Sequence, residues 1–432
     1  MVKKVIFALL LTALVFGTVL VHAAPQEKYG GPKCEYLKIA INRAGGLEKV
    51  KEGLGTTNIK IGALIPLSGA LASFADEQYA AKLAVRDINT CFKELGLPFH
   101  VTLIVEDTQT MPQIALEKAR KLVNIDHVHM IVGPATSAAV GTLQDVINTE
   151  LKVILMSHSS TSPLVRFNNE AAIKKMGYSY VFFSVSSDLF QGKALASVVH
   201  SFGYKKVVFF YRNDDYGRGF ALAFKQAFEN LGGKAYLIPY DPNARSYLAE
   251  LRSIYNYNPQ AIVWLAFDEI KVILRQALTL GLQKYPWFFT EAVKGPALLA
   301  DPVVAKILAI KHVLGTAPYT AGNFIKYYES VYGKAPVEFS DTLYDAVWLV
   351  TLGALRAASF NPNLMEHAII EMSYIYKGFS GQKSMNAIYQ EPLTTSYSIW
   401  TVKIVNGKPT FVDVGFWSPS TGLKLYEKIV PK

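Results

Sequence analysis

The chain has 432 residues, of which 51% are hydrophobic and 18% charged, and its formal net charge is +10. This composition is typical of a well-packed globular protein of two or three domains, and it excludes a chain that is largely disordered. The positive residues are scattered and form no arginine-rich run, so they indicate general surface charge and predict no nucleic-acid partner.

The N-terminus has the pattern of a secretory signal peptide. Lys3 and Lys4 precede a long apolar run, and the small residues that follow suit cleavage after Ala23. We therefore expect residues 1–23 to be removed and the protein to be exported, to the periplasm or outside the cell. The length of the apolar run leaves an uncleaved N-terminal membrane anchor as the alternative.

Residues 24–58 form an extension before the first predicted strand, and their amphipathic pattern favours helix. The extension contains Cys34, and Cys91 lies near the end of the first long helix predicted after it. An even number of cysteines in an exported chain permits one disulfide, which would tie the extension to the rest of the protein. Two unpaired buried thiols are the alternative.

From residue 59 onward, short apolar runs alternate with amphipathic patterns of helical period. The first set of strands is predicted at 59–67, 101–107, 129–134 and 152–157, and its first helix runs from about Ala72 to Leu95. A second set starts with a strand at 180–185 and continues at 207–212, 234–240, 261–267 and 287–290. Two such successions predict an α/β protein with two doubly wound, parallel sheets.

The last part of the chain departs from this alternation. Helices are predicted around 321–332 and 338–359. Alternating apolar runs on either side of Asn406–Gly407 then predict a β-hairpin.

Ligands of open α/β sheets bind beyond the carboxyl ends of the strands, so the loops that follow the strands are the candidate site. Four of these loops carry suitable residues: PLSGALASF, GPATSAA, MSHSSTSP and FTEAVKG. In the last loop Glu291 directly follows an aromatic strand, where a buried carboxylate is costly unless a cation meets it. We expect that cation to come from outside the chain, the alternative being a solvated strand end.

These loops, together with YRNDDYGRGFALAFKQAF, stand in an order that resembles the leucine/isoleucine/valine-binding family of type I periplasmic binding proteins. Members of that family are extracytoplasmic receptors of branched-chain amino acid ABC transporters. The resemblance covers roughly residues 59–400 and implies two α/β lobes joined by three crossovers. Lobe 1 is then expected at 59–183 plus 315–394, and lobe 2 at 184–314 plus 395–432. The crossovers are expected near Phe183–Ser184, near Gly315–Pro318 and after Gly381.

The resemblance also implies a binding site for an amino acid. Ser137, Ser159 and Thr161 match the positions that hold the ligand's α-carboxylate. Ser137 should open a helix, whose N-terminal amides and dipole favour an anion, although it could also be a plain N-cap and the SHSSTSP run a polar turn. Glu291 matches the carboxylate of the other lobe that meets the ligand's ammonium.

Three aromatic positions of the family's cleft match Phe74, Tyr216 and Phe267. The family commonly has tyrosine at the first and third, so this site is expected to be more apolar and to favour a hydrophobic side chain; core packing is the alternative for Phe267. Asp268 is interpreted as the N-cap of the next helix, or else as a second carboxylate for a basic or polar ligand. The family's arginine at the entry to the second lobe is missing from VFFSVSS.

The sequence contains no HExxH, no CxxC pair, no P-loop and no GxSxG, so no metal, cofactor or enzymatic activity is predicted. His158 has no evident partner and is interpreted as a turn residue. The predicted function is a monomeric substrate-binding protein that delivers a hydrophobic amino acid to the permease and ATPase of an ABC importer. A receptor for urea or short amides and a ligand-binding sensor of the same fold are the alternatives.

Overall fold

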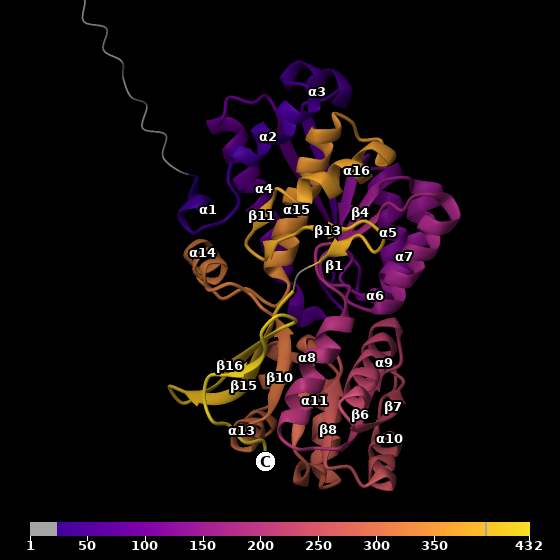
Figure 1. The fold of residues 1–432 in the computed structure, drawn as a ribbon, viewed down its shortest axis with the longest axis vertical. Helices are drawn as coiled ribbons and strands as arrows, with labels where there is room; N and C mark the ends of the chain where they lie inside the picture. Colours follow the sequence, from indigo (N-terminus) through magenta and orange to yellow (C-terminus); the bar gives the residue numbers. More distant parts are fainter. Residues whose placement is uncertain (1–23, 394) are drawn as a thin grey trace, which may run out of the picture.

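The structure, a computed structural model, describes residues 24–393 and 395–432. The predicted signal peptide, or anchor, at residues 1–23 lies outside this part of the chain. Two sheets form the cores of two lobes, which lie one above the other in Figure 1. Between residues 24 and 432, leaving out 394, no helix is long and apolar enough to cross a membrane.

The first sheet has five parallel strands in the order β2-β1-β3-β4-β5. The strands are β1 (Asn58–Ile65), β2 (His100–Asp107), β3 (Met130–Val132), β4 (Ile154–Ser157) and β5 (Val181–Phe183). The strand predicted to open the second set is therefore the last strand of the first sheet, since β5 pairs with β4. Its run of apolar residues cannot by itself say which of two sheets it joins.

Helices from distant parts of the sequence cover the first sheet. They are α4 (Glu77–Glu94), α5 (Pro112–Asn124), α6 (Ser137–Val146), α7 (Pro163–Met176), α15 (Ser340–Ala357) and α16 (Pro362–Ser373). The helix predicted from Ala72 is broken: a 3-10 turn spans Ala72–Phe74, and α4 begins only at Glu77. Residues 340–355 of α15 are all buried, and Figure 1 shows this helix among the elements of the first lobe.

The N-terminal extension forms three short helices, α1 (Pro25–Lys28), α2 (Glu35–Ala44) and α3 (Leu47–Leu54). Helices α2 and α3 pack against α15, at the end of the first lobe that points away from the second lobe in Figure 1. A disulfide joins Cys34 to Cys91 on α4. The extension is thus part of the first lobe.

The second sheet has eight strands in the order β17-β16-β15-β10-β9-β8-β6-β7. Five are parallel: β6 (Lys206–Arg212), β7 (Lys234–Tyr240), β8 (Ala261–Leu265), β9 (Trp287–Phe289) and β10 (Leu314–Pro318). Three are antiparallel, β15 (Tyr397–Val405), β16 (Lys408–Ser418) and β17 (Gly422–Leu425), and the first two form the hairpin predicted at Asn406–Gly407.

The main helices of the second lobe are α8 (Asp188–Ser201), α9 (Asp215–Asn230), α10 (Leu248–Ser253), α11 (Ile270–Thr279), α12 (Pro296–Leu299) and α13 (Pro302–Lys311). The chain passes between the lobes three times: after β5, after β10 and before β15. It returns to the first lobe through α14 (Gly322–Tyr332). Four two-residue strands, β11 (Lys377–Gly378), β12 (Gly381–Gln382), β13 (Met385–Asn386) and β14 (Glu391–Pro392), precede the third passage.

Strand β10 pairs with β9 and β15, so residues 314–318 belong to the second sheet. A division after Pro318 therefore fits the sheets better than the predicted one at 315. With that change, we propose the two-lobe division given above as the domain organisation of the chain.

Candidate functional site

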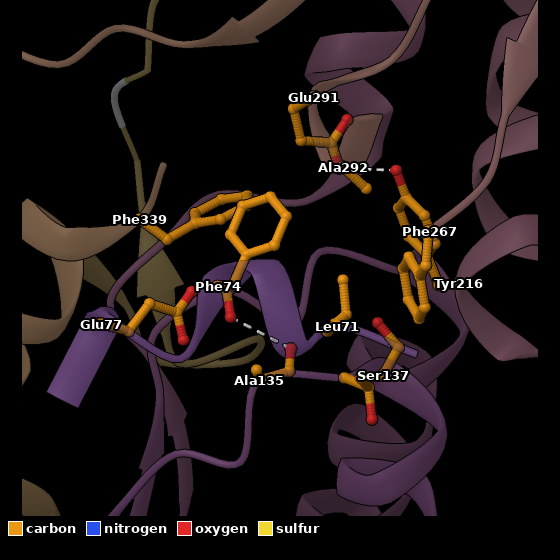
Figure 2. A pocket seen from close by; sticks show the side chains of 12 residues that line it. Leu71, Phe74, Glu77, Ala135, Ser137, Tyr216, Phe267, Glu291, Ala292 and Phe339 are labelled. Carbon is orange, nitrogen blue, oxygen red and sulfur yellow. Dashed lines mark hydrogen bonds between the residues drawn. The ribbon is translucent and has the colours of Figure 1, made fainter. Parts of the chain in front are cut away.

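A cavity lies between the lobes, where the carboxyl ends of parallel strands from the two sheets face each other (Figure 2). Its volume is about 380 Å³, including the part that opens to solvent. The first lobe contributes Leu71, Phe74, Glu77, Ala135, Thr136, Ser137, Ser159 and Phe339, and the second contributes Tyr216, Phe267, Glu291 and Ala292. All the predicted binding residues except Thr161 therefore line one cavity.

One wall of the cavity is built from neutral hydrogen-bonding groups. Ser137 is the first residue of α6, and the helix is capped by Thr136, whose hydroxyl accepts a hydrogen bond from the amide of Ala139. The Ser137 Oγ accepts hydrogen bonds from Ser160 Oγ at 3.0 Å and from the amide of Ser162 at 3.2 Å. Ser137 lines the cavity and, with both acceptor positions occupied, its own proton is left for a further acceptor.

Ser159 and Thr161 occupy the loop after β4 in different ways. Ser159 Oγ donates to the carbonyl of Ala135 at 3.1 Å and borders the cavity. Thr161 is buried behind the lining, where its carbonyl accepts a hydrogen bond of 2.8 Å from the amide of Asp188. Contact of Thr161 with a ligand stays a prediction.

Glu291 stands opposite this wall, in the turn that follows β9, and only 1% of it is exposed. Its Oε1 accepts from Tyr216 Oη at 2.7 Å, and its Oε2 accepts from Gln191 Nε2 at 2.7 Å. Burial raises the pKa of Glu291 to about 7, although both donors act to lower it. Within the described residues Glu291 has no ion-pair partner, so its charge is compensated only by neutral donors.

Asp188, which the sequence analysis did not single out, is a second carboxylate beside Glu291. It is the first residue of α8 and is fully buried, and neither of its oxygens has a hydrogen-bond partner that meets normal geometry. Burial, followed by the charge of Glu291, raises the pKa of Asp188 well above its ordinary value. Its position at the start of a helix after a strand is the signal that could have identified it.

A positive charge reaches the first crossover from another element. The predicted absence of an arginine in VFFSVSS holds for that segment, but Arg166 on α7 donates to the carbonyl of Val185 at 3.0 Å. The same guanidinium forms a buried ion pair of 2.9 Å with Glu391 and acts to lower the pKa of Asp188. Arg166 therefore places a positive charge beside the first crossover, behind the lining of the cavity.

Aromatic rings form the apolar part of the lining. The rings of Tyr216 and Phe267 are stacked with centroids 5.6 Å apart, and the Arg212 guanidinium lies over the Phe267 ring, 3.6 Å from its centroid. Phe339, which the sequence analysis missed, has φ 64°, a left-handed conformation that is strained for a bulky residue. No sequence pattern predicts such a conformation, which directs the ring of Phe339 to the cavity (Figure 2).

Two interpretations from the sequence are wrong. His158 is not a turn residue without a partner, because it is fully buried and its Nε2 lies 3.0 Å from Glu77 Oε2. Asp268 does not cap a helix, because α11 begins two residues later with Glu269 at the cap position. Its carboxylate instead accepts from the amide and hydroxyl of Ser73, at 3.1 and 2.6 Å, across the space between the lobes.

Across residues 24–393 and 395–432, no group of three or more histidine, cysteine, aspartate or glutamate side chains is arranged to hold a metal ion.

The sequence matches the periplasmic binding protein family over residues 58–408. The chain belongs to the leucine/isoleucine/valine-binding family of type I periplasmic binding proteins. Members of this family are binding proteins, and the α/β fold of this one matches theirs.

Two relatives illustrate the similarity of sequence. An uncharacterised protein of Methanocaldococcus jannaschii is 27% identical over 390 residues, which cover 84% of this binding protein and 90% of that one. A Leu/Ile/Val-binding protein of Rhizobium johnstonii is 30% identical over 182 residues, which cover 42% of this chain and 46% of the relative.

Two solved structures share the fold of this binding protein. A leucine-binding protein from Thermotoga maritima has a TM-score of 0.71 at 24% identity and covers 84% of this chain and 99% of its own. A branched-chain amino acid transporter substrate-binding protein from Streptococcus pneumoniae, in complex with isoleucine, has a TM-score of 0.65 at 24% identity, with coverages of 84% and 100%.

Proposed function

We propose that this protein is the exported substrate-binding component of an ABC importer, and that it binds a zwitterionic amino acid with a mainly apolar side chain between its lobes. The observation that carries the proposal is Glu291. It is a buried carboxylate without a cationic partner among the described residues, and it faces a wall of neutral donors across a small cavity.

The two walls are complementary to the two charges of an α-amino acid. The free proton of Ser137 and the N-terminal amides of α6 suit a carboxylate, because aligned backbone amides and the helix dipole favour an anion. Glu291, with Asp188 beside it, suits an ammonium. An amino acid therefore bridges the lobes and stabilises the closed arrangement.

The remainder of the lining favours an apolar side chain. Leu71, Phe74, Phe267 and Phe339 surround the cavity, and burial of apolar surface contributes about 25 cal/mol per Å². The S. pneumoniae neighbour binds isoleucine, which agrees with this chemistry. In this proposal the protein acts as a monomer that docks on a permease, carries no cofactor and catalyses no reaction.

Some solved neighbours of similar fold bind aromatic acids, among them 4-hydroxybenzoate. Such a ligand has a carboxylate for the Ser137 wall but no ammonium for Glu291. A buried charge left without its partner costs about 3–5 kcal/mol, so we expect an amino acid to be strongly preferred. Urea and short amides lack the opposed charges and are disfavoured for the same reason.

The proposal is tested by a thermal-shift screen of the mature protein against the twenty amino acids, urea, acetamide and 4-hydroxybenzoate. A ligand that binds only the native state raises the melting temperature, by an amount that corresponds to about 2.7 kcal/mol at a hundredfold excess over its Kd. We expect shifts with amino acids that have apolar or mainly apolar side chains. Shifts with amides or benzoates alone would contradict the proposed ligand class.

A further inference from the structure

We call Ser137, Glu291 and the groups around them the zwitterion site. A further carboxylate lies at the end of the cavity away from that site. Glu77, the first residue of α4, lines the cavity and is 1% exposed. Figure 2 shows Glu77 beside Phe339 and Phe74, on the opposite side of the cavity from Ser137 and Tyr216. A ligand held by its α-carboxylate and ammonium at the other end would direct its side chain toward Glu77.

Glu77 has one hydrogen-bond partner, His158, and neither of these two polar groups is used by the zwitterion site. Its Oε2 lies 3.0 Å from Nε2 of His158, and no hydrogen bond in the described part of the chain involves its Oε1. His158 is fully buried, and its Nδ1 has no partner. A proton on Nδ1 would be a buried donor without an acceptor, so the neutral ring that donates from Nε2 accounts for this arrangement.

In this arrangement His158 holds Oε2 of Glu77, and Oε1 is left for a ligand. Among the described residues, neither a lysine nor an arginine lines this cavity. A purely aliphatic side chain would cover Oε1 without offering it a hydrogen bond, which is unfavourable for a buried acceptor. A side chain that ends in a donor would restore the hydrogen bond.

We propose that Glu77, oriented by His158, makes the site selective for an amino acid whose side chain is apolar along its length and ends in a hydrogen-bond donor. This inference rests on the proposed function and narrows its ligand class. The donor is a neutral hydroxyl or N–H, or an ammonium, and both sources share the chemistry that Oε1 requires. A lost hydrogen bond to a charged group changes affinity about ten- to a hundredfold.

The test uses calorimetric titration of the mature protein with three matched pairs: valine and threonine, phenylalanine and tyrosine, norleucine and lysine. We expect the donor member of at least one pair to bind about tenfold or more tightly than its apolar counterpart. Preference in the first two pairs identifies a neutral donor, and preference in the third identifies a cation.

Equal or tighter binding of the apolar member in all three pairs would overturn the inference and leave the proposed function intact. Failure of every amino acid to bind would overturn both. The wild-type titrations decide these outcomes without any variant.

A variant identifies the residue responsible. Glu77→Gln keeps the shape of the side chain but turns an amide donor toward the cavity when its oxygen accepts from His158, so the preference for the donor member should fall to about threefold or less. Glu366→Gln is the matched control, because Glu366 is also buried but is bonded to Gln390 and Ser179 away from the cavity. A preference that survives unchanged in Glu77→Gln would overturn the role assigned to Glu77.

Discussion

The buried carboxylates in two regions of this protein differ in how many hydrogen-bond donors surround them. In the core of the first lobe, Asp345 accepts hydrogen bonds from Tyr376 Oη at 2.7 Å, from the amide of Phe379 at 3.1 Å and from the amide of Ser380 at 2.9 Å. Asp87 is similarly surrounded by Tyr327, Tyr344 and Arg86.

The two carboxylates that line the cavity have fewer partners. Glu291 accepts hydrogen bonds from two neutral donors, and Glu77 has one partner, His158. Asp188, which is buried beside Glu291 but outside the lining, has no partner with normal geometry. Burial is comparable in the two regions, so exposure alone does not separate them. A buried carboxylate that is surrounded by hydrogen-bond donors stabilises the fold, whereas one with few donors beside a cavity is a binding group.

The largest effect is expected on stability, at Asp345. Asp345→Ala leaves two amides and the Tyr376 hydroxyl without an acceptor, and it removes one of the two carboxylates near Lys383. We expect the free energy of unfolding of the first lobe to fall by about 3–5 kcal/mol, measured by urea denaturation of the ligand-free protein. A loss below about 1 kcal/mol would contradict the structural role assigned to Asp345.

At Glu291 we expect the opposite result, a large loss of ligand affinity without a loss of stability. Glu291→Ala removes the partner of the ligand's ammonium, so affinity should fall by about two to three and a half orders of magnitude. The ligand-free melting temperature should stay the same or rise at neutral pH, because an ionised group that burial disfavours has been removed. Calorimetry and a thermal melt measure both quantities, with Glu366→Gln as the control.

The pH dependence sharpens the same comparison. The pKa of Glu291 is raised to about 7, from an ordinary value of 4.5. A raised carboxyl pKa means that stability is fully present below the unfolded pKa and is lost as pH rises through the folded one. For the ligand-free protein we therefore expect the free energy of unfolding to fall by about 3 kcal/mol between pH 4.5 and pH 8.

Ligand affinity should show the reverse trend, because the ammonium requires the ionised form of Glu291. For a single group with a pKa of about 7, affinity is about tenfold weaker at pH 6 than at pH 8. Calorimetric titrations at the two values measure this ratio, and Glu291→Gln should reduce it. A wild-type affinity that does not change with pH would contradict the assignment.

The smallest effect is expected at Glu338, a buried carboxylate of the first lobe whose ion-pair partner lies in the second lobe. Its Oε1 lies 2.7 Å from Nζ of Lys294, which follows the Glu291 turn in the second lobe. Glu338→Gln weakens a contact that exists when the lobes are closed, so we expect affinity to fall about three- to tenfold with the fold unchanged. Calorimetry measures the loss, and small-angle scattering would show a larger open fraction without ligand.

The sequence was sufficient for most of the architecture. Apolar runs of strand length that alternate with amphipathic helices predicted both sheets, because that periodicity follows directly from burial on both faces. Periodicity could not decide to which sheet β5 belongs, nor that β10 lies in the second sheet, since pairing between strands is not encoded locally.

The candidate site was predictable where a residue follows a strand within a recognisable loop, as Ser137, Tyr216 and Glu291 do. It was not predictable where the decisive contact comes from a distant element. Arg166, for example, reaches the first crossover from α7, and the partner of His158 is 81 residues away in sequence. Such contacts depend on packing between lobes and helices and leave no local pattern.

The central claim is that Glu291 binds the ammonium of an amino acid. The most direct test compares the amino acid found in the screen with its deaminated analogue, the same molecule without the amino group, by calorimetric titration of wild type and Glu291→Ala. We predict that the analogue binds the wild type at least about a hundredfold more weakly, and that the difference falls to about tenfold or less in the variant. Equal binding of the two molecules to the wild type, or an unchanged difference in Glu291→Ala, would contradict the claim.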